Sequence, residues 1–65
     1  MENWKKLFEV KYEKIILDLD DMFILEKGER VFIEMKPGYE WPRCHGYDIA
    51  LEENEFNELF KEVTL

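Results

Sequence analysis

The chain has 65 residues, which is enough for one small domain and excludes an elaborate active site assembled from many structural elements. Hydrophobic residues make up 46% of the chain and aromatic residues 15%, a composition that favours a folded core over disorder. The 16 acidic residues outnumber the 9 basic ones and give a formal charge of -7, so we expect no direct binding to nucleic acid or to an anionic membrane.

Apolar runs and cysteine content bear on location. No apolar run approaches the roughly 20 residues of a membrane span, and the first residues lack the apolar stretch of a secretory signal. The single cysteine, Cys44, excludes an intramolecular disulfide and fits a reducing compartment. We therefore expect a cytoplasmic protein that forms a single domain over residues 1–65.

Alternating residues near the amino terminus predict a first strand. In residues 7–13, Phe8, Val10 and Tyr12 alternate with charged residues, and this period of two places three apolar side chains on one face of a sheet. A short helix over residues 3–8 is the alternative for the start of this segment, and the sequence leaves that choice open.

Residues 15–19 are a second β-prone run, and Asp18, Asp20 and Asp21 end it with residues typical of turns. Residues 22–26 and 29–35 then flank Lys27 and Gly28, which predicts a β-hairpin with these two residues as its loop. The facing pairs of this hairpin are Ile24 with Val31, Met22 with Ile33, and Phe23 with Phe32. On the second face, Phe23, Leu25 and Phe32 need cover from the chain or from another molecule.

The last third of the chain predicts a loop, a strand and a helix. Both prolines and two of the three glycines lie in residues 36–46, which excludes a helix or central strand there. Residues 47–51 predict a short strand. In residues 52–63, apolar side chains recur at helical spacing at Phe56, Leu59, Phe60 and Val63. The expected fold is α+β, a small antiparallel β-meander of three to five strands with a C-terminal amphipathic helix packed on one face.

Acidic residues concentrate near the carboxyl terminus, beside a stiff loop that carries aromatic residues. On a continuous helix, Glu55, Glu58 and Glu62 form one stripe. The loop supplies residue types that are frequent in interface hot spots. The predicted partner-binding residues are Asp48, Glu52, Glu55, Glu58, Glu62, Tyr39, Trp41 and Arg43. Each also has a structural interpretation, as a solvated face for the acids or as a plug for the core in the case of Trp41.

Sequence patterns that carry catalysis or metal binding are weak in this chain. Cys44 and His45 are neighbours, and in an extended segment neighbouring side chains point to opposite sides. One cysteine and one histidine are too few for a zinc site, and the acidic run at Asp18, Asp20 and Asp21 lacks the glycine and glutamate of a calcium loop. We expect no enzyme activity, no catalytic residues, no metal and no cofactor.

The expected function is a small intracellular protein that binds and inhibits a larger partner by occupying its basic surface. That partner is a nucleic-acid-binding protein or a toxin, and the acidic residues replace its phosphates. In size and acidity the chain is similar to the DNA-mimicking inhibitors of phages and mobile elements and to some immunity proteins and antitoxins. The alternative is an accessory subunit or a homo-oligomeric module, including a homodimer, that uses the exposed sheet face of Phe23, Leu25 and Phe32.

Overall fold

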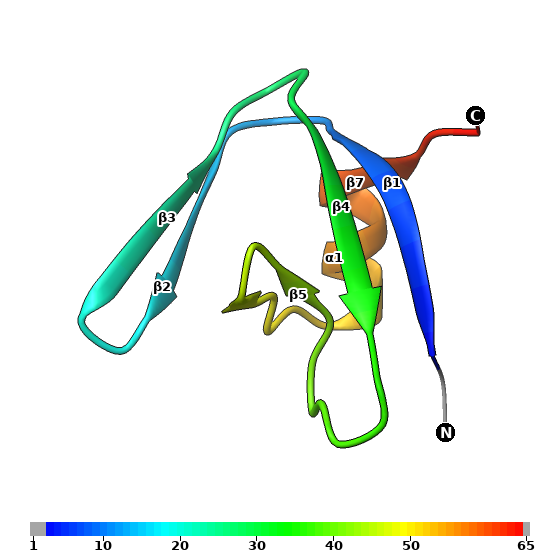
Figure 1. Ribbon diagram of the computed structural model, residues 1–65. Coiled ribbons are helices and arrows are strands. Elements are labelled where there is room, and N and C mark those ends of the chain that lie inside the picture. Colours follow the sequence, from blue (N-terminus) through cyan, green and yellow to red (C-terminus); the bar gives the residue numbers. More distant parts are fainter. Residues whose placement is uncertain (1–2, 65) are drawn as a thin grey trace.

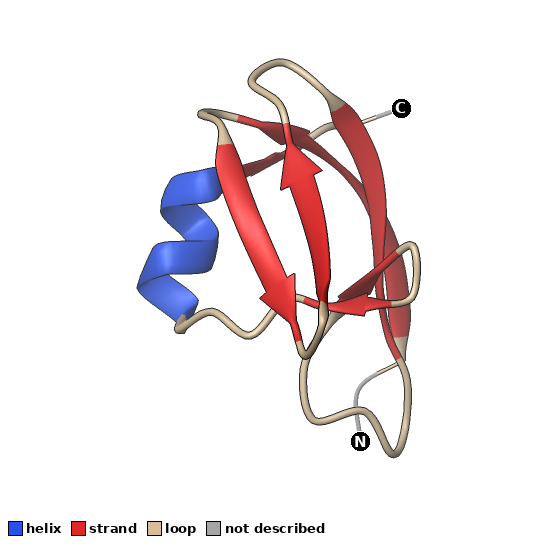
Figure 2. Ribbon diagram, turned by 90° about the vertical axis from the view of Figure 1, so that its left-hand side faces the viewer, coloured by secondary structure: helices blue, strands red, loops and turns tan. Residues whose placement is uncertain are grey.

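The computed structural model describes residues 3–64, and within them it contains seven strands and one helix (Figures 1 and 2). In chain order they are β1 (Trp4–Val10), β2 (Lys14–Asp18), β3 (Asp21–Leu25), β4 (Arg30–Met35), β5 (Arg43–Cys44), β6 (Tyr47–Asp48), α1 (Glu53–Leu59) and β7 (Phe60–Glu62). One sheet has the order β6-β5-β4-β1-β7, and β2 and β3 form a second sheet. The α+β class is confirmed in this broad form, but the strands form two sheets instead of one meander of three to five strands.

The first four strands are the two arms of one long hairpin. Trp4 lies opposite Met35 in the β1–β4 pair, and Lys14 lies opposite Leu25 in the β2–β3 pair. The residue numbers of facing partners have the same sum in both pairs, so the register continues from one sheet into the other. The chain reverses at the tip, between β2 and β3, where Leu19 has a positive φ of 54°.

This hairpin bends in its middle, where residues 11–13 and 26–29 interrupt the strands of both arms. The Val10 N–H donates to the carbonyl oxygen of Glu29, and the Gly28 N–H donates to the carbonyl oxygen of Val10, both at 2.8 Å. The Glu29 N–H donates to the carbonyl oxygen of Glu26 at 3.1 Å, which closes a turn in which Gly28 adopts a positive φ of 87°. As a result β2 and β3 leave the direction of β1 and β4 at a sharp corner (Figure 1).

The bend corrects the predicted hairpin around Lys27 and Gly28. Met22 lies opposite Leu17, and Ile24 lies opposite Ile15, so neither contacts β4 as the sequence had indicated. The prediction of a turn at Lys27 and Gly28 was right, but this turn bends the chain without reversing it. Residues 4–10 are a strand, which decides against the alternative helix over residues 3–8.

The predicted C-terminal helix is shorter than its apolar spacing indicated. Helix α1 ends at Leu59, and Phe60 is extended, with φ -115° and ψ 139°. The chain then forms β7, in which Phe60 pairs with Val10 and Glu62 pairs with Phe8 on the free edge of β1. Pairing with this edge satisfies backbone groups that an exposed last helical turn would leave to water. The predicted strand over residues 47–51 is likewise shorter, because only Tyr47–Asp48 is a strand.

The core lies between the inner faces of the two halves of the bent hairpin, the β5–β6 region and α1. Phe8 is central to one end of it, with ring centroids 5.4 Å from Phe56, 5.8 Å from Phe60 and 6.4 Å from Trp4. The buried residues are Phe8, Val10, Ile16, Leu25, Val31, Ile33, Cys44, Ile49, Leu59 and Phe60. Over the described residues, no helix has the length and apolar character needed to cross a membrane.

We expect the substitution Gly28→Ala to lower the free energy of unfolding by about 1 kcal/mol, because an L-residue is strained at positive φ. A Cβ at this position would meet no atom within 4 Å, so the cost comes from the backbone alone. Urea denaturation measures the change. Lys27→Ala is the matched control and should change little. Incorporation of D-alanine at position 28 by chemical synthesis should preserve stability, and a loss as large as that of L-alanine would contradict the backbone explanation.

Candidate interaction surfaces

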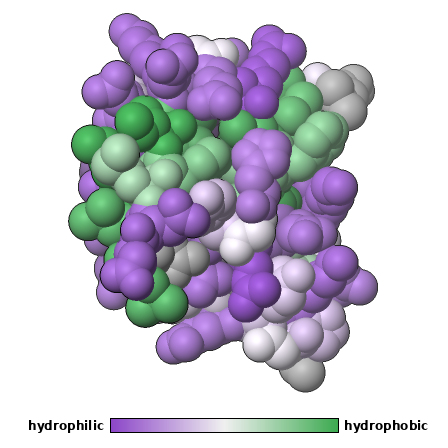
Figure 3. Space-filling model, turned by 60° about the vertical axis from the view of Figure 1, so that its left-hand side comes forward, coloured by the Kyte–Doolittle hydropathy of each residue, from purple (hydrophilic) through white to green (hydrophobic). Residues whose placement is uncertain are grey.

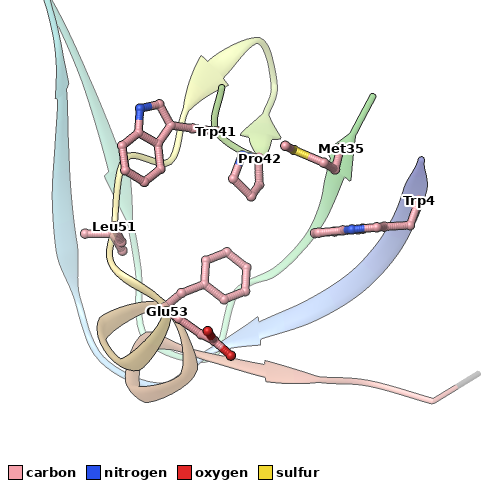
Figure 4. A pocket seen from close by; sticks show the side chains of 7 residues that line it. Trp4, Met35, Trp41, Pro42, Leu51 and Glu53 are labelled. Carbon is pink, nitrogen blue, oxygen red and sulfur yellow. The ribbon is translucent and has the colours of Figure 1, made fainter. Parts of the chain in front are cut away.

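An apolar groove lies between the start of β1, the loop that follows β4 and helix α1 (Figure 4). Its volume is about 280 Å³. The lining residues are Trp4, Met35, Trp41, Pro42, Leu51, Glu53 and Phe56. Six of these seven side chains are apolar, and Figure 4 shows the carboxylate of Glu53 at the side of the groove that α1 supplies.

The groove is held open by backbone contacts. Trp4 and Met35 are cross-strand partners at the end of the β1–β4 ladder. The Ile49 N–H donates to the carbonyl oxygen of Pro42 at 2.8 Å, which ties the Trp41 loop to the segment that leads into α1. Trp41 is half-buried and forms a wall of the groove. It therefore neither plugs the core completely nor stands fully exposed as a contact residue, the two alternatives that the sequence had left open.

Three of the predicted partner-binding residues contact one another. The Arg43 Nε donates to Asp48 Oδ1 at 2.8 Å across the β5–β6 pair. The Arg43 guanidinium also lies 4.1 Å from the centre of the Tyr39 ring, a cation–π contact. The charges of Arg43 and Asp48 therefore largely neutralise each other, and neither contributes a separate charge to the surface.

The four predicted glutamates do not form one helical stripe. Glu52, Glu55 and Glu58 are exposed at the start of α1 or on it. Glu62 lies on β7, where its carboxylate is 3.8 Å from Lys6 Nζ. The predicted stripe of Glu55, Glu58 and Glu62 was wrong, because the helix ends at Leu59.

Sequence reasoning missed most of the groove. Trp4, Met35, Leu51 and Phe56 come from four separate segments, and no spacing in the sequence indicates that they meet. Glu53 was not among the predicted partner-binding residues, although it lines the groove. Of the predicted partner-binding residues, Trp41 lines this groove, whereas Glu55 and Glu58 are exposed elsewhere on α1.

Cys44 is the last residue of β5, and His45 is the first residue of the tight turn that follows. His45 and Gly46 both have positive φ, 52° and 83°, in the two-residue connection between β5 and β6. The side chain of His45 contacts the ring of Phe23 at a centroid distance of 5.8 Å, whereas Cys44 is fully buried. Burial, and secondarily the charge of Glu29, raises the pKa of the Cys44 thiol to about 11, so the thiol stays protonated at neutral pH. No group of three or more potential metal-binding side chains occurs within residues 3–64.

A second surface lies on the outer side of the β2–β3 hairpin (Figure 3). Cross-strand pairs place Ile15 beside Ile24 and Leu17 beside Met22, and these four side chains are 44% to 75% exposed. Leu19 at the tip is 99% exposed. We call these five residues, Ile15, Leu17, Leu19, Met22 and Ile24, the apolar hairpin face.

The apolar hairpin face replaces the exposed face that the sequence had indicated. Leu25 is fully buried, and Phe23 is half-buried beneath Tyr47, whose ring stacks on it at 4.9 Å and 8°. Phe32 alone of the three predicted residues is exposed, with Lys5 Nζ 5.4 Å from its ring centre. The prediction failed because β3 pairs with β2 and the corner turns its other face to the core.

Comparisons with protein-family models, with curated proteins and with solved structures found no match. We therefore infer function from the two surfaces of this chain, the groove and the apolar hairpin face, and from the charges around them.

We expect the Cys44 thiol to make stability fall as the pH rises from about 9 to about 11. The pKa of the thiol is higher in the folded state than in the unfolded chain, so the unfolded chain releases this proton at lower pH. The unfolded state is therefore stabilised relative to the folded state over that range. The loss is on the order of 2 kcal/mol. It is measured as the difference between wild type and Cys44→Ala in the free energy of unfolding at pH 8 and pH 10.5. Parallel pH profiles for the two proteins would contradict the assignment.

Proposed function

We propose that the protein is a small cytoplasmic inhibitor that binds a larger protein by occupying a basic surface on it. The observation that carries this proposal is the groove, whose lining is apolar except for Glu53 and one wall of which is helix α1, which also carries the exposed Glu55 and Glu58. A site of this kind fits an apolar side chain of the partner that has basic residues around it.

Charge and packing have separate roles in this binding mode. The net charge of -7 and the glutamates Glu52, Glu55 and Glu58 attract a basic surface and raise the rate of encounter. Trp41 and Phe56 then supply apolar contact, which depends on shape and selects one basic partner from others. The bond between Ile49 and Pro42 holds the Trp41 loop in place before binding, which reduces the entropy lost on association.

The remaining predicted contact residues support this surface more than they form it. Arg43 donates a hydrogen bond to Asp48 and lies over the ring of Tyr39, and these contacts fix the β5–β6 turn. Glu62 lies next to Lys6, which reduces its net attraction for a cation. In the proposal, Trp41, Glu52, Glu55 and Glu58 make the main contacts. Where the partner's basic surface binds nucleic acid, the carboxylates take the place of phosphates and exclude it.

We expect the immobilised domain to capture a basic protein from a lysate of its own cells at low salt and to lose it at high salt, because screening weakens charge attraction. With the identified partner purified, Trp41→Ala should weaken binding by about 2 kcal/mol, as for a central aromatic hot spot. Glu55→Lys combined with Glu58→Lys should slow association and flatten the salt dependence. Calorimetry and stopped-flow kinetics measure these effects.

Tyr12→Ala is the matched control, since Tyr12 is an exposed aromatic residue that does not line the groove. It should leave affinity unchanged. Labelled nucleic acid bound to the partner should be released when the domain is added, as followed by fluorescence anisotropy. Salt-independent binding, equal effects of Trp41→Ala and Tyr12→Ala, or a stable ternary complex with nucleic acid would each reject a part of the proposal.

A further inference from the structure

The β2–β3 hairpin is attached to the rest of the molecule by side chains and not by its backbone. Its two strands pair only with each other. Within the described residues, no backbone hydrogen bond joins residues 14–25 to any other segment. In contrast, β1 and β4 each pair with two neighbours in the five-stranded sheet. Backbone pairing therefore fixes β1 and β4 but not the direction of the β2–β3 hairpin.

Lys11 anchors the corner of the long hairpin to helix α1. Its backbone N–H donates to the carbonyl oxygen of Leu59 at 2.7 Å, and its Nζ donates to the carbonyl oxygen of Asn57 at 2.8 Å. Residues 12–13 and 26–29 then connect the anchored part of the molecule to the β2–β3 hairpin, and neither segment is part of a strand. A movement of the hairpin is therefore confined to these two short segments.

The pairing inside the β2–β3 hairpin allows it to move as one body. Five facing pairs hold its strands together, and the first of them is Lys14 with Leu25. The register is the same as in the β1–β4 pair, so the two arms stay in step across the corner. The hairpin can thus change its direction without a slip of register in either sheet.

Tyr47 on β6 holds the outer end of the hairpin. Its hydroxyl donates to Asp21 Oδ2 at 3.1 Å, and the Met22 N–H orients the same carboxylate by donating to Oδ1 at 3.1 Å. The Tyr47 ring stacks on the Phe23 ring at 4.9 Å and 8°, and His45 meets the Phe23 ring with its edge at 5.8 Å. We call the contacts of Tyr47 with Phe23 and Asp21 the latch.

The packing beneath the hairpin leaves a space on the side of β2. Ile16 and Leu25 are buried in the core and hold the hairpin from within. A pocket of about 180 Å³ nevertheless lies beside β2, and its lining includes Asp48, Ala50 and Leu51 from the segment that precedes α1. Apolar burial at two positions and the latch are thus the attachments that an opening of the hairpin must break.

We propose that the β2–β3 hairpin is a flap that opens as one unit about the corner, and that the latch holds it closed while the rest of the fold stays intact. Opening removes the cover of Ile16, Phe23 and Leu25 and widens the pocket beside β2. A ligand shifts an equilibrium toward the state that it binds more tightly, so a molecule that binds these residues selects the open form. This device does not depend on the function proposed for the groove.

Amide hydrogen exchange under native conditions, followed by NMR, tests whether the flap opens by itself. A two-stranded hairpin detached from its core is only marginally stable in water, so the amides of residues 14–25 exchange whenever the flap is open. Their largest protection factors should be lower than those of β1 and β4 by roughly tenfold or more. Equal protection in the two sheets would show that they open only together, and it would overturn the proposal.

Two tyrosine variants test the latch. Tyr47→Phe removes the hydroxyl and keeps the ring, so it should raise the exchange rates of residues 14–25 by about fivefold, as expected for one hydrogen bond, and leave β1 and β4 unchanged. Tyr39→Phe is the matched control, because this half-buried tyrosine contacts Arg43 and not the hairpin. It should change no exchange rate in the flap.

The acceptor of the hydrogen bond provides a second test. In an Asp21→Ala background, Tyr47→Phe should have little further effect, because both substitutions remove the same bond. Additive effects of these two substitutions, equal effects of Tyr47→Phe and Tyr39→Phe, or faster exchange that extends equally to β1 and β4 would each reject the latch. The last result would mean that Tyr47 stabilises the whole fold and not the closed flap.

Discussion

The pair of backbone hydrogen bonds at Val10 is the constraint on which the rest of the molecule depends. They connect Val10 to Gly28 and Glu29 and bend both arms of the long hairpin at one point. Because the arms bend together without losing register, the inner faces of β1–β4 and β2–β3 turn toward the same core. The same bend exposes the opposite side of β2–β3. The buried core and the apolar hairpin face are thus two consequences of one corner, and the stack of Tyr47 on Phe23 secures the second half of the hairpin against β6.

Local sequence indicated the elements better than it indicated their partners. The alternation at Phe8 and Val10, the turn at Gly28 and the apolar spacing of Phe56 and Leu59 all correspond to features of the structure. The sequence did not distinguish a turn that reverses the chain from one that bends it, because both contain a residue with positive φ. That choice depends on the pairing of β1 with β4, which joins residues distant in the sequence. The end of the helix has a similar cause, since the free edge of β1 takes Phe60 into a strand.

For the candidate site, the sequence likewise indicated some of the residue types but not which residues contact one another. Composition identified Trp41, which lines the groove, and the acids of the last third of the chain, of which Glu55 and Glu58 are exposed on α1. It did not identify that Arg43 and Asp48, five residues apart, face each other across a two-residue turn and largely cancel in charge. Nor did it indicate that Trp4 completes the groove from the other end of the chain. A charge counted in a sequence contributes to binding only after its pairing in the folded molecule is known.

The groove and the apolar hairpin face meet at Leu51. This residue lines the groove, and together with Ile15 and Leu17 it also lines a second pocket of about 180 Å³ beside β2. A single partner that covers both surfaces would therefore bury a continuous area, and the second contact would form at a high effective concentration once the first had formed. The groove alone is too small for a specific interface, and a partner that also covered the apolar hairpin face would bury an area closer to the roughly 800 Å² per partner of a standard one. The corner at Gly28 sets the direction of the hairpin and so the angle between the two surfaces.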